Sequence, residues 1–385
     1  MHVATGLDLL VRDGFARLQG QRIGLVCNQA TVDCGLTHAL DLFLVPHREG
    51  RLRIGAVFGP QHGLWGAQQD NMIEWEGGVD PRTGLVVHSL YGEHREPTDA
   101  MLEGLERLVI DLPDIGARYY TFMWTLALCL KACARLGIPV TVLDRPNPIG
   151  SACEGPVLDP RFDSFVGLLP LPTRHGRTLG ELARHFQAAH FPSVALEVVA
   201  CEGWDGASAL DATGLPWVMP SPNMPTLETA FVYPGMCLLE GTQLSEGRGT
   251  TRPFEIFGAP SIDAWAYAEA MNGLRLPGCH FRPYVFEPTF HKFAGQACGG
   301  AFLHVTSRTT FEPVLTAIAA LQEVQRGWPS AMLWRPAPYE YEYDKRPIDI
   351  LAGNDWMRPA IENLKPLAGI RERMTAELAT FHWQG

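Results

Sequence analysis

The sequence is poor in charge and has no long hydrophobic run. Charged residues make up 19% of the 385 residues, below the ~25% usual for soluble domains. Lys and Arg total 31 against 42 Asp and Glu, so the formal net charge is −11. This balance, without basic clusters, argues against a nucleic-acid partner. The longest uncharged, largely apolar stretch is Tyr119–Leu130, which is well short of the ~20 residues of a membrane span.

Targeting and disulfide signals are also missing. No Lys or Arg precedes Arg12, and Asp8 and Asp13 interrupt the first apolar segment, so we expect no signal peptide. The nine cysteines are scattered singly, without a CxxC pair. That pattern favours buried free thiols in a reducing compartment. Together these features predict a cytoplasmic protein.

Four familiar motifs are absent. The sequence has no GxxxxGK[ST], HExxH or GxSxG, which excludes a P-loop, a zincin and the nucleophile elbow of α/β-hydrolases. The nearest approach to the dinucleotide fingerprint GxGxxG is Gly247-Arg248-Gly249, which lacks the third glycine and does not follow a strand.

What is present is an alternation of buried strands and helices. With 46% hydrophobic residues, the chain has enough apolar material for a large core. Short β-branched runs without polar alternation suit parallel strands that are buried on both faces. We therefore predict an α/β fold: a Rossmann-like, doubly wound, mostly parallel sheet (residues 1–236), followed by a smaller α/β domain (237–385). The loop 237–260, rich in Gly and Pro, should lie at the interdomain cleft. The predicted strands are 22–27, 52–58, 85–90, 108–112, 138–143 and 196–200, and the main helices are 97–105, 120–136, 178–189, 262–271 and 311–324.

Polar side chains follow each of the first five predicted strands. The carboxyl ends of parallel strands share one edge of a sheet, and ligands of open α/β sheets bind there. These residues are therefore candidates for catalysis or binding: Asn28, Gln61, His62, Glu93, Asp111, Asp114, Arg118, Tyr120, Asp144, Arg145 and Asn147. The alternative is that some of them, such as Asp111, only brace loops through backbone N–H groups.

The later loops add a second set of candidates. Asn223 follows a rigid Ser-Pro turn, and its amide both donates and accepts hydrogen bonds. Arg248 between two glycines suits bidentate binding of a carboxylate, for which the alternative is an interdomain salt bridge. Glu240 and Thr250 lie on the same loop, and Glu154 lies in a predicted turn after the fifth strand.

Two chemistries fit these residues. Glycoside hydrolysis needs a carboxylic acid to protonate the leaving oxygen and a second group to activate water or act as nucleophile. A metal-dependent hydrolase using Asp111, Asp114 and Asp144 is the weaker alternative, because no His partner pattern accompanies them. We expect the ends of the early strands to form one sugar-sized hollow with Tyr120, Asp144, Asn223 and Arg248.

A series of motifs occurs in one order along residues 5–385: FGPQHGLWG, SLYG, DLPDIGARYYTFMWT, LDRPNP, HGRTLGELA, PSPNMP and EGTQLSEGRGTTRPF. In these motifs the sequence resembles the bacterial exo-β-N-acetylmuramidases, long known as domain of unknown function 1343 and now glycoside hydrolase family 171. The resemblance implies a Rossmann-like N-terminal domain, a smaller C-terminal domain and a cleft between them. It implies removal of terminal N-acetylmuramic acid from the non-reducing ends of peptidoglycan fragments, and no cofactor.

One residue departs from the family pattern. The family usually has Pro-Glu-His-Gly after the second strand, where this chain has Pro60-Gln61-His62-Gly63. Glutamine cannot replace a carboxylic acid as proton donor, and general acid catalysis is worth ~10²–10⁴-fold. Three outcomes are open: a nearby carboxyl group takes over, the substrate needs less acid assistance, or the chain binds a sugar without cleaving it. The segment that follows supplies candidate acids and binding residues: Asp70, Asn71, Glu74, Glu76 and, further on, Glu93.

Overall fold

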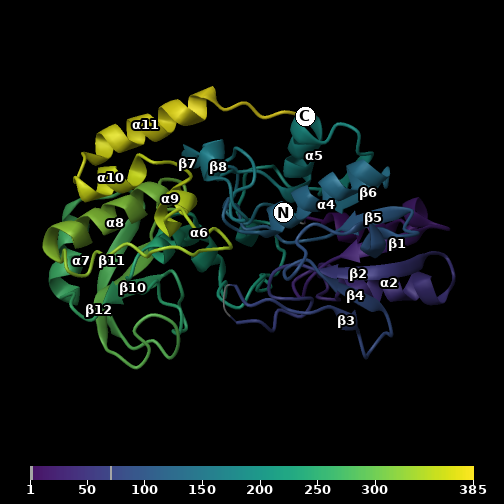
Figure 1. Cartoon of the computed structure of the whole chain (residues 1–385), viewed down its shortest axis with the longest axis horizontal. Coiled ribbons are helices and arrows are strands. Elements are labelled where there is room, and N and C mark those ends of the chain that lie inside the picture. The colour runs from purple at the N-terminus through teal and green to yellow at the C-terminus, as the bar shows by residue number, and fades with distance from the viewer. Residues whose placement is uncertain (1–2, 70–71) are drawn as a thin grey trace.

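The computed structural model describes residues 3–69 and 72–385 and has two lobes (Figure 1). The N-terminal lobe is built on a seven-stranded sheet in the order β3-β4-β2-β1-β5-β6-β9, in which β3 alone is antiparallel to its neighbour. This confirms the predicted α/β class and the mostly parallel sheet. The strands are β1 (Arg22–Val26), β2 (Arg53–Gly59), β3 (Gly78–Val79), β4 (Val86–Ser89), β5 (Arg107–Ile110), β6 (Val140–Leu143) and β9 (Leu196–Val199).

The strand order explains where a ligand can approach. Among the parallel strands, the chain first builds outward from β1 through β2 to β4, and then restarts on the other side of β1 with β5, β6 and β9. The order therefore reverses between β1 and β5. Binding crevices of open α/β sheets form at this switch point, outside the carboxyl ends of the strands.

Helices cover both faces of this sheet. On one face, Leu40 and Phe43 of α2 pack with Leu25 of β1 in a buried cluster. On the other face, Trp124 and Phe186 belong to a larger core that continues into the C-terminal lobe. The helices of this lobe are α1 (Gly6–Arg12), α2 (Ala39–Arg48), α3 (Asp99–Leu102), α4 (Phe122–Leu136) and α5 (Leu179–His190).

Two local predictions for helices are confirmed. Helix α4 is buried over most of its length, and Gly137 ends it in the left-handed region at φ 68°, where glycine has no Cβ to clash. Thr178 and Glu181 form the predicted capping box at the start of α5.

The C-terminal lobe has a three-stranded antiparallel sheet in the order β10-β12-β11. Helices α7 and α8 pack against each other, and α7 packs on β11 and β12. The elements are β10 (Ile256–Ala259), β11 (Cys279–Phe286), β12 (Cys298–Val305), α6 (Leu227–Met236), α7 (Ala264–Gly273), α8 (Pro313–Gly327), α9 (Pro347–Ala352), α10 (Met357–Glu362) and α11 (Leu367–Thr380).

The two lobes are tied together at several places. The hairpin β7 (Glu154–Val157) and β8 (Pro172–Arg174) precedes β9 in the chain but packs against α11. After α11 the chain crosses back to α5 (Figure 1), where the Gln384 amide donates to Nδ1 of His185 at 3.0 Å. Within the described part of the chain, no helix combines the length and apolar character needed to cross a membrane.

Candidate active site

A cleft between the lobes collects five of the predicted residues. It is lined by the turn after β2, the segment before α4, the loop before α6, and two loops of the C-terminal lobe. We call it the interdomain cleft. The predicted residues on its wall are Gln61, His62, Tyr120, Asn223 and Arg248. The walls also include residues that the sequence did not single out: Thr121, Met224, Tyr233, Phe254, Tyr339 and Glu340.

Gln61 is held on both sides of its amide. Its Oε1 accepts from the Thr121 hydroxyl at 2.6 Å, and its Nε2 donates to the Tyr91 hydroxyl at 3.1 Å. Tyr91 in turn donates to a carboxylate oxygen of Glu340 at 2.9 Å. A fixed hydrogen-bonded chain therefore runs from the turn after β2 to the C-terminal lobe.

His62 and Asn223 are fixed by the same loop. His62 has a left-handed backbone, with φ 70°, and its Nδ1 lies 2.7 Å from the Gln68 carbonyl. The Asn223 amide donates to the Gln69 carbonyl at 2.8 Å. The loop after β2 is thus bonded to the segment that leads into α6.

Arg248 lies in a buried ionic cluster. Its Nη2 is 2.8 Å from Glu240, and its Nε is 3.3 Å from Glu246. Because Glu240, Glu246 and Arg248 are all on the 237–260 loop, this pairing is not the interdomain salt bridge that was the alternative. Burial works against the Glu246 carboxylate, but Lys292, His291 and Arg248 outweigh it and lower its pKa.

One terminal nitrogen of Arg248 is left unsatisfied. Its Nη1 is buried and has no hydrogen-bond partner among the described residues. A buried donor without a partner costs free energy, and Arg248 lines the cleft. The flanking Gly247 and Gly249 are needed for this placement, because a Cβ would come within 2.3 Å of the Ile256 carbonyl oxygen or 2.5 Å of the Phe290 carbonyl oxygen.

We expect Lys292→Met to lower the free energy of unfolding at pH 7 by about 3 kcal/mol, because it leaves the Glu246 carboxylate buried with less compensation. Urea unfolding measures this change. The double variant Lys292→Met/Glu246→Gln is the control and should recover most of the loss. A loss below about 1 kcal/mol for the single variant, as for an exposed ion pair, contradicts this view of the cluster.

Several predicted binding residues lie outside the cleft and bond to other parts of the protein. The Asn28 amide donates to the Pro220 carbonyl at 2.9 Å, and the Asn147 amide donates to the Arg177 carbonyl at 3.0 Å. Asp144 accepts from the Thr178 hydroxyl and the Gly180 amide, each at 2.8 Å, and so caps α5. Burial raises the pKa of Asp144 to about 6 against these hydrogen bonds. Tyr120, Asn223 and Arg248 thus share the expected hollow, but Asp144 lies elsewhere.

The three aspartates of the metal alternative have different partners. Asp111 is buried and accepts from Nε and Nη2 of Arg145 at 2.5 and 2.9 Å. Asp114 accepts from the Gly116 amide and lies 3.0 Å from Nε2 of His175. Asp144 caps α5, so the three carboxylates are each engaged by different groups. No cluster of three metal-binding side chains is found in the described ranges.

Arg118 and Glu154 join the lobes. Arg118 is buried and donates to the Leu351 carbonyl at 2.7 Å and the Leu171 carbonyl at 3.2 Å, and burial lowers its pKa to about 10. Glu154 lies in β7 rather than in a turn, and it accepts from the Leu315 amide at the start of α8 at 2.9 Å. Burial raises the pKa of Glu154 to about 7.

The remaining predicted residues that the structure describes also lie off the cleft wall. The Glu93 side chain is 89% exposed, and with Glu74 and Glu76 it lines a different surface hollow. The Thr250 hydroxyl donates to the Gly247 carbonyl at 2.6 Å. Glu240 is buried and ion-paired with Arg248. Asp70 and Asn71 lie outside the described residues.

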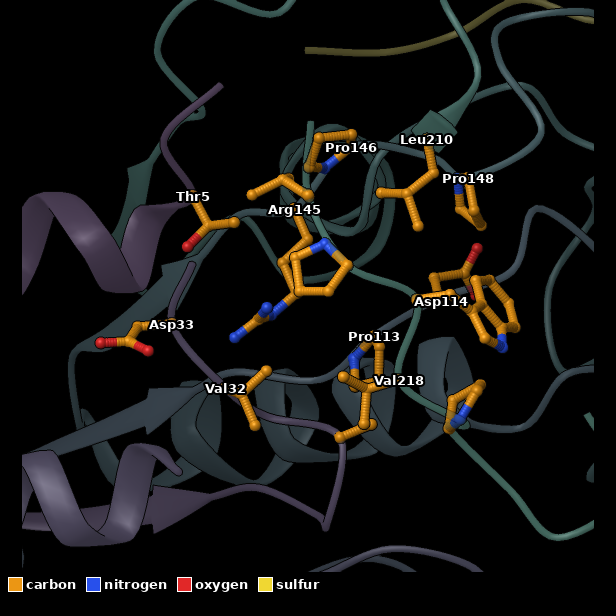
Figure 2. Close-up of a pocket in the computed structure, with 15 residues that line it drawn as sticks. Thr5, Val32, Asp33, Pro113, Asp114, Arg145, Pro146, Pro148, Leu210 and Val218 are labelled. Atoms are coloured by element: carbon orange, nitrogen blue, oxygen red, sulfur yellow. The ribbon is translucent and has the colours of Figure 1, made fainter. Parts of the chain in front are cut away.

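A second pocket occupies the switch point of the sheet. Figure 2 shows the Arg145 side chain in its centre, with Asp33 and Asp114 on opposite sides. Much of the wall is apolar and comes from the segment that precedes Ser221, including Leu210, Trp217 and Val218. Asn28 and Gln29 hold this segment through the Pro220 carbonyl. Rossmann-type sheets bind dinucleotides at this switch point. In this chain the segment before Ser221 lines that position.

Glu340 is the main site residue that the sequence analysis missed. It lies in the run Tyr339-Glu340-Tyr341-Glu342-Tyr343, whose alternation of tyrosine and acid was the available signal. It is 2% exposed, and burial raises its pKa to about 7, with Glu240 adding to the rise and Tyr91, Arg248 and Arg95 opposing it.

Comparison with known proteins assigns the family. Residues 23–228 match the N-terminal part and residues 231–384 the C-terminal part of "Exo-beta-N-acetylmuramidase NamZ". The chain belongs to the NamZ family. It is 42% identical over 365 residues to the peptidoglycan beta-N-acetylmuramidase NamZ of Bacillus subtilis (strain 168), covering 94% of this chain and 84% of that protein.

Two crystal structures share the fold of this NamZ family member. Both are DUF1343 family proteins from Bacteroides fragilis NCTC 9343, and each alignment covers 98% of this chain and 96% of the other. One has a TM-score of 0.87 at 30% identity, and the second has 0.76 at 27%. The resemblance seen in the sequence motifs is thus confirmed over both lobes.

Proposed function

We propose that this chain is a glycosidase that removes terminal N-acetylmuramic acid from peptidoglycan fragments. The observation that carries the proposal is the unpartnered Nη1 of Arg248 on the wall of the interdomain cleft, in a member of the NamZ family. N-acetylmuramic acid differs from N-acetylglucosamine by a lactyl ether with a carboxylate. A guanidinium donor is the natural partner of that carboxylate.

The rest of the cleft suits a sugar. Tyr233 and Phe254 contribute aromatic side chains to the cleft wall, and these suit the apolar face of a pyranose ring. Gln61, Ser221 and Asn223 supply amide and hydroxyl groups for sugar hydroxyls and the acetamido group. Such a combination of apolar walls and a few polar groups is typical of small-ligand sites.

Purified protein should release the chromophore from 4-nitrophenyl β-N-acetylmuramide. We expect the matched glucosaminide, which lacks the lactyl carboxylate, to be cleaved at least ~10-fold more slowly in kcat/KM, since a charge-assisted hydrogen bond contributes about 1.5–3 kcal/mol. Folded protein that leaves both the chromogenic muramide and a muramyl disaccharide intact would overturn the proposal.

A second function is favoured by Gln61. An amide where the resemblance implies a carboxylic acid fits a protein that binds muropeptides without cleaving them. Calorimetry that finds tight binding of a muropeptide and no turnover would support this alternative, and a Gln61→Glu variant that gains hydrolysis would strengthen it.

We further propose that the protein acts in the cytoplasm on imported muropeptide fragments. Support comes from the nine cysteines, all of which are free thiols, five of them buried. Cell fractionation tests the proposal, and recovery of the native protein in an exported fraction would contradict it.

A further inference from the structure

We propose that Glu340 is the proton donor of this chain and that it protonates the glycosidic oxygen from the tip of a strained hairpin in the C-terminal lobe. The inference rests on the proposed glycosidase function and deepens it by naming the acid.

The backbone around Glu340 is unusual. Tyr339 and Glu342 exchange both backbone hydrogen bonds, each at 2.9 Å, so that Glu340 and Tyr341 form the two central residues of a tight turn. Their φ angles are +45° and +68°. Turns with two positive φ angles are normally made by Asn-Gly or similar pairs. A glutamate and a tyrosine in these positions are strained, and such strain persists where a function or its surroundings require it.

Specific contacts offset this strain. The Tyr339 hydroxyl donates to Glu240 at 2.6 Å. The guanidinium of Arg95 lies 3.4 Å from the centre of the Tyr341 ring, which is a close cation–π contact. The Tyr91 hydroxyl donates to Glu340 itself. Groups from both lobes thus fix the turn so that the Glu340 side chain reaches the interdomain cleft.

Glu340 has the position that an acid needs. Among the described residues that line the cleft, it contributes the only carboxyl group. It is joined to Gln61 through one atom, the Tyr91 hydroxyl, by bonds of 3.1 and 2.9 Å. Gln61 carries no acidic proton. The Glu340 carboxyl group on the opposite wall supplies the acidic proton that position 61 lacks.

The charges around Glu340 suit this role. The charged groups that act on Glu340 most strongly are Tyr91, Arg95, Glu240 and Arg248. Tyr339 and Tyr341 flank it in the turn, His62 lines the same cleft, and Glu96, Asp163 and Glu342 line a second hollow that Glu340 also borders. Burial and Glu240 favour the protonated carboxyl, whereas Arg95, Arg248 and the Tyr91 hydroxyl favour the carboxylate. A pKa raised to about 7 keeps the acid partly protonated at neutral pH.

The Glu340 carboxyl gives its proton to the glycosidic oxygen while the bond from that oxygen to C1 breaks, and the bonding electron pair stays on the oxygen. A water oxygen then bonds to C1, and one water proton returns to the Glu340 carboxylate. The products are free N-acetylmuramic acid and the shortened glycan, and the enzyme is restored.

The test compares Glu340→Gln with the control Glu342→Gln, which lies two residues away in the same hairpin. On a muramyl disaccharide, we expect Glu340→Gln to lower kcat by ~10²–10⁴-fold, the usual value of general acid catalysis. On 4-nitrophenyl N-acetylmuramide the loss should be at least tenfold smaller, because the weakly basic leaving group needs little protonation. The wild-type rate should fall above about pH 7, and Glu342→Gln should keep both rates within about twofold.

The outcomes distinguish the role of Glu340 from the proposed glycosidase function. Wild-type protein that cleaves both substrates, while Glu340→Gln stays within tenfold of it on the disaccharide, overturns the role of Glu340 alone. Equal losses on both substrates also overturn it, since they indicate a structural role. Wild-type protein that cleaves neither substrate removes the proposed function, and the acid with it.

Discussion

Replacing Arg248 with alanine is expected to lower kcat/KM for 4-nitrophenyl β-N-acetylmuramide by ~10²–10³-fold. The variant loses the buried donor that we assign to the lactyl carboxylate, and truncating one partner of a buried charge pair costs about 2–5 kcal/mol. Each 1.4 kcal/mol corresponds to a factor of ten. The matched glucosaminide lacks this carboxylate, so its kcat/KM should fall much less.

A matched variant separates recognition from folding. Arg248→Ala also leaves the Glu240 and Glu246 carboxylates short of a partner, which destabilises the lobe. Arg248→Lys keeps a positive charge between them but loses the planar fork of donors. We expect it to be nearly as stable as wild type in thermal unfolding and to lose most of the preference for the muramide. Equal losses on both glycosides would contradict the assignment of Arg248 to the lactyl group.

Glu340→Gln is expected to raise the free energy of unfolding at pH 8 by about 3 kcal/mol while it lowers kcat on a muramyl disaccharide. The folded pKa of about 7 lies above the ordinary value of 4.5. Below pH 4.5 the carboxyl is protonated in both states and costs nothing. As the pH rises to 7 and beyond, the folded state must carry a buried carboxylate, and the stability from this group is lost.

Urea unfolding of wild type and variant at pH 4.5 and pH 8 measures this difference directly. Glu154 and Asp144, whose pKa values are also raised, titrate in both proteins and cancel in the comparison. The two proteins should be similar at pH 4.5. A variant that is less stable than wild type at pH 8 would show that the Glu340 carboxylate stabilises the fold, contrary to this account.

The sheet was predictable from the sequence because its strands are short apolar runs. Arg22–Val26 and Val140–Leu143 needed no knowledge of distant residues, since burial on both faces leaves a continuous hydrophobic pattern. The hairpin β7–β8 was missed because its strands are short and contain proline. The division at residue 236 stays a prediction; α6, just before it, packs against α8 of the C-terminal lobe.

The site was harder to predict for a physical reason. Polar residues after strands either bind ligands or satisfy backbone groups, and their spacing is the same in both cases. Gln61 and Tyr120 reach the cleft, whereas Asn28, Asp144 and Asn147 bond to loops and to the start of a helix. Glu340 comes from the other end of the chain, and only the closure of the two lobes brings it to Gln61.

The most direct test of this account is a crystal structure of the protein with N-acetylmuramic acid. We predict that the sugar lies in the interdomain cleft with its carboxylate on Arg248. Its anomeric oxygen should lie within about 3 Å of a Glu340 carboxyl oxygen, the reach that proton transfer requires. A sugar bound instead in the switch-point pocket beside Arg145 and Trp217, with Glu340 untouched, would contradict it.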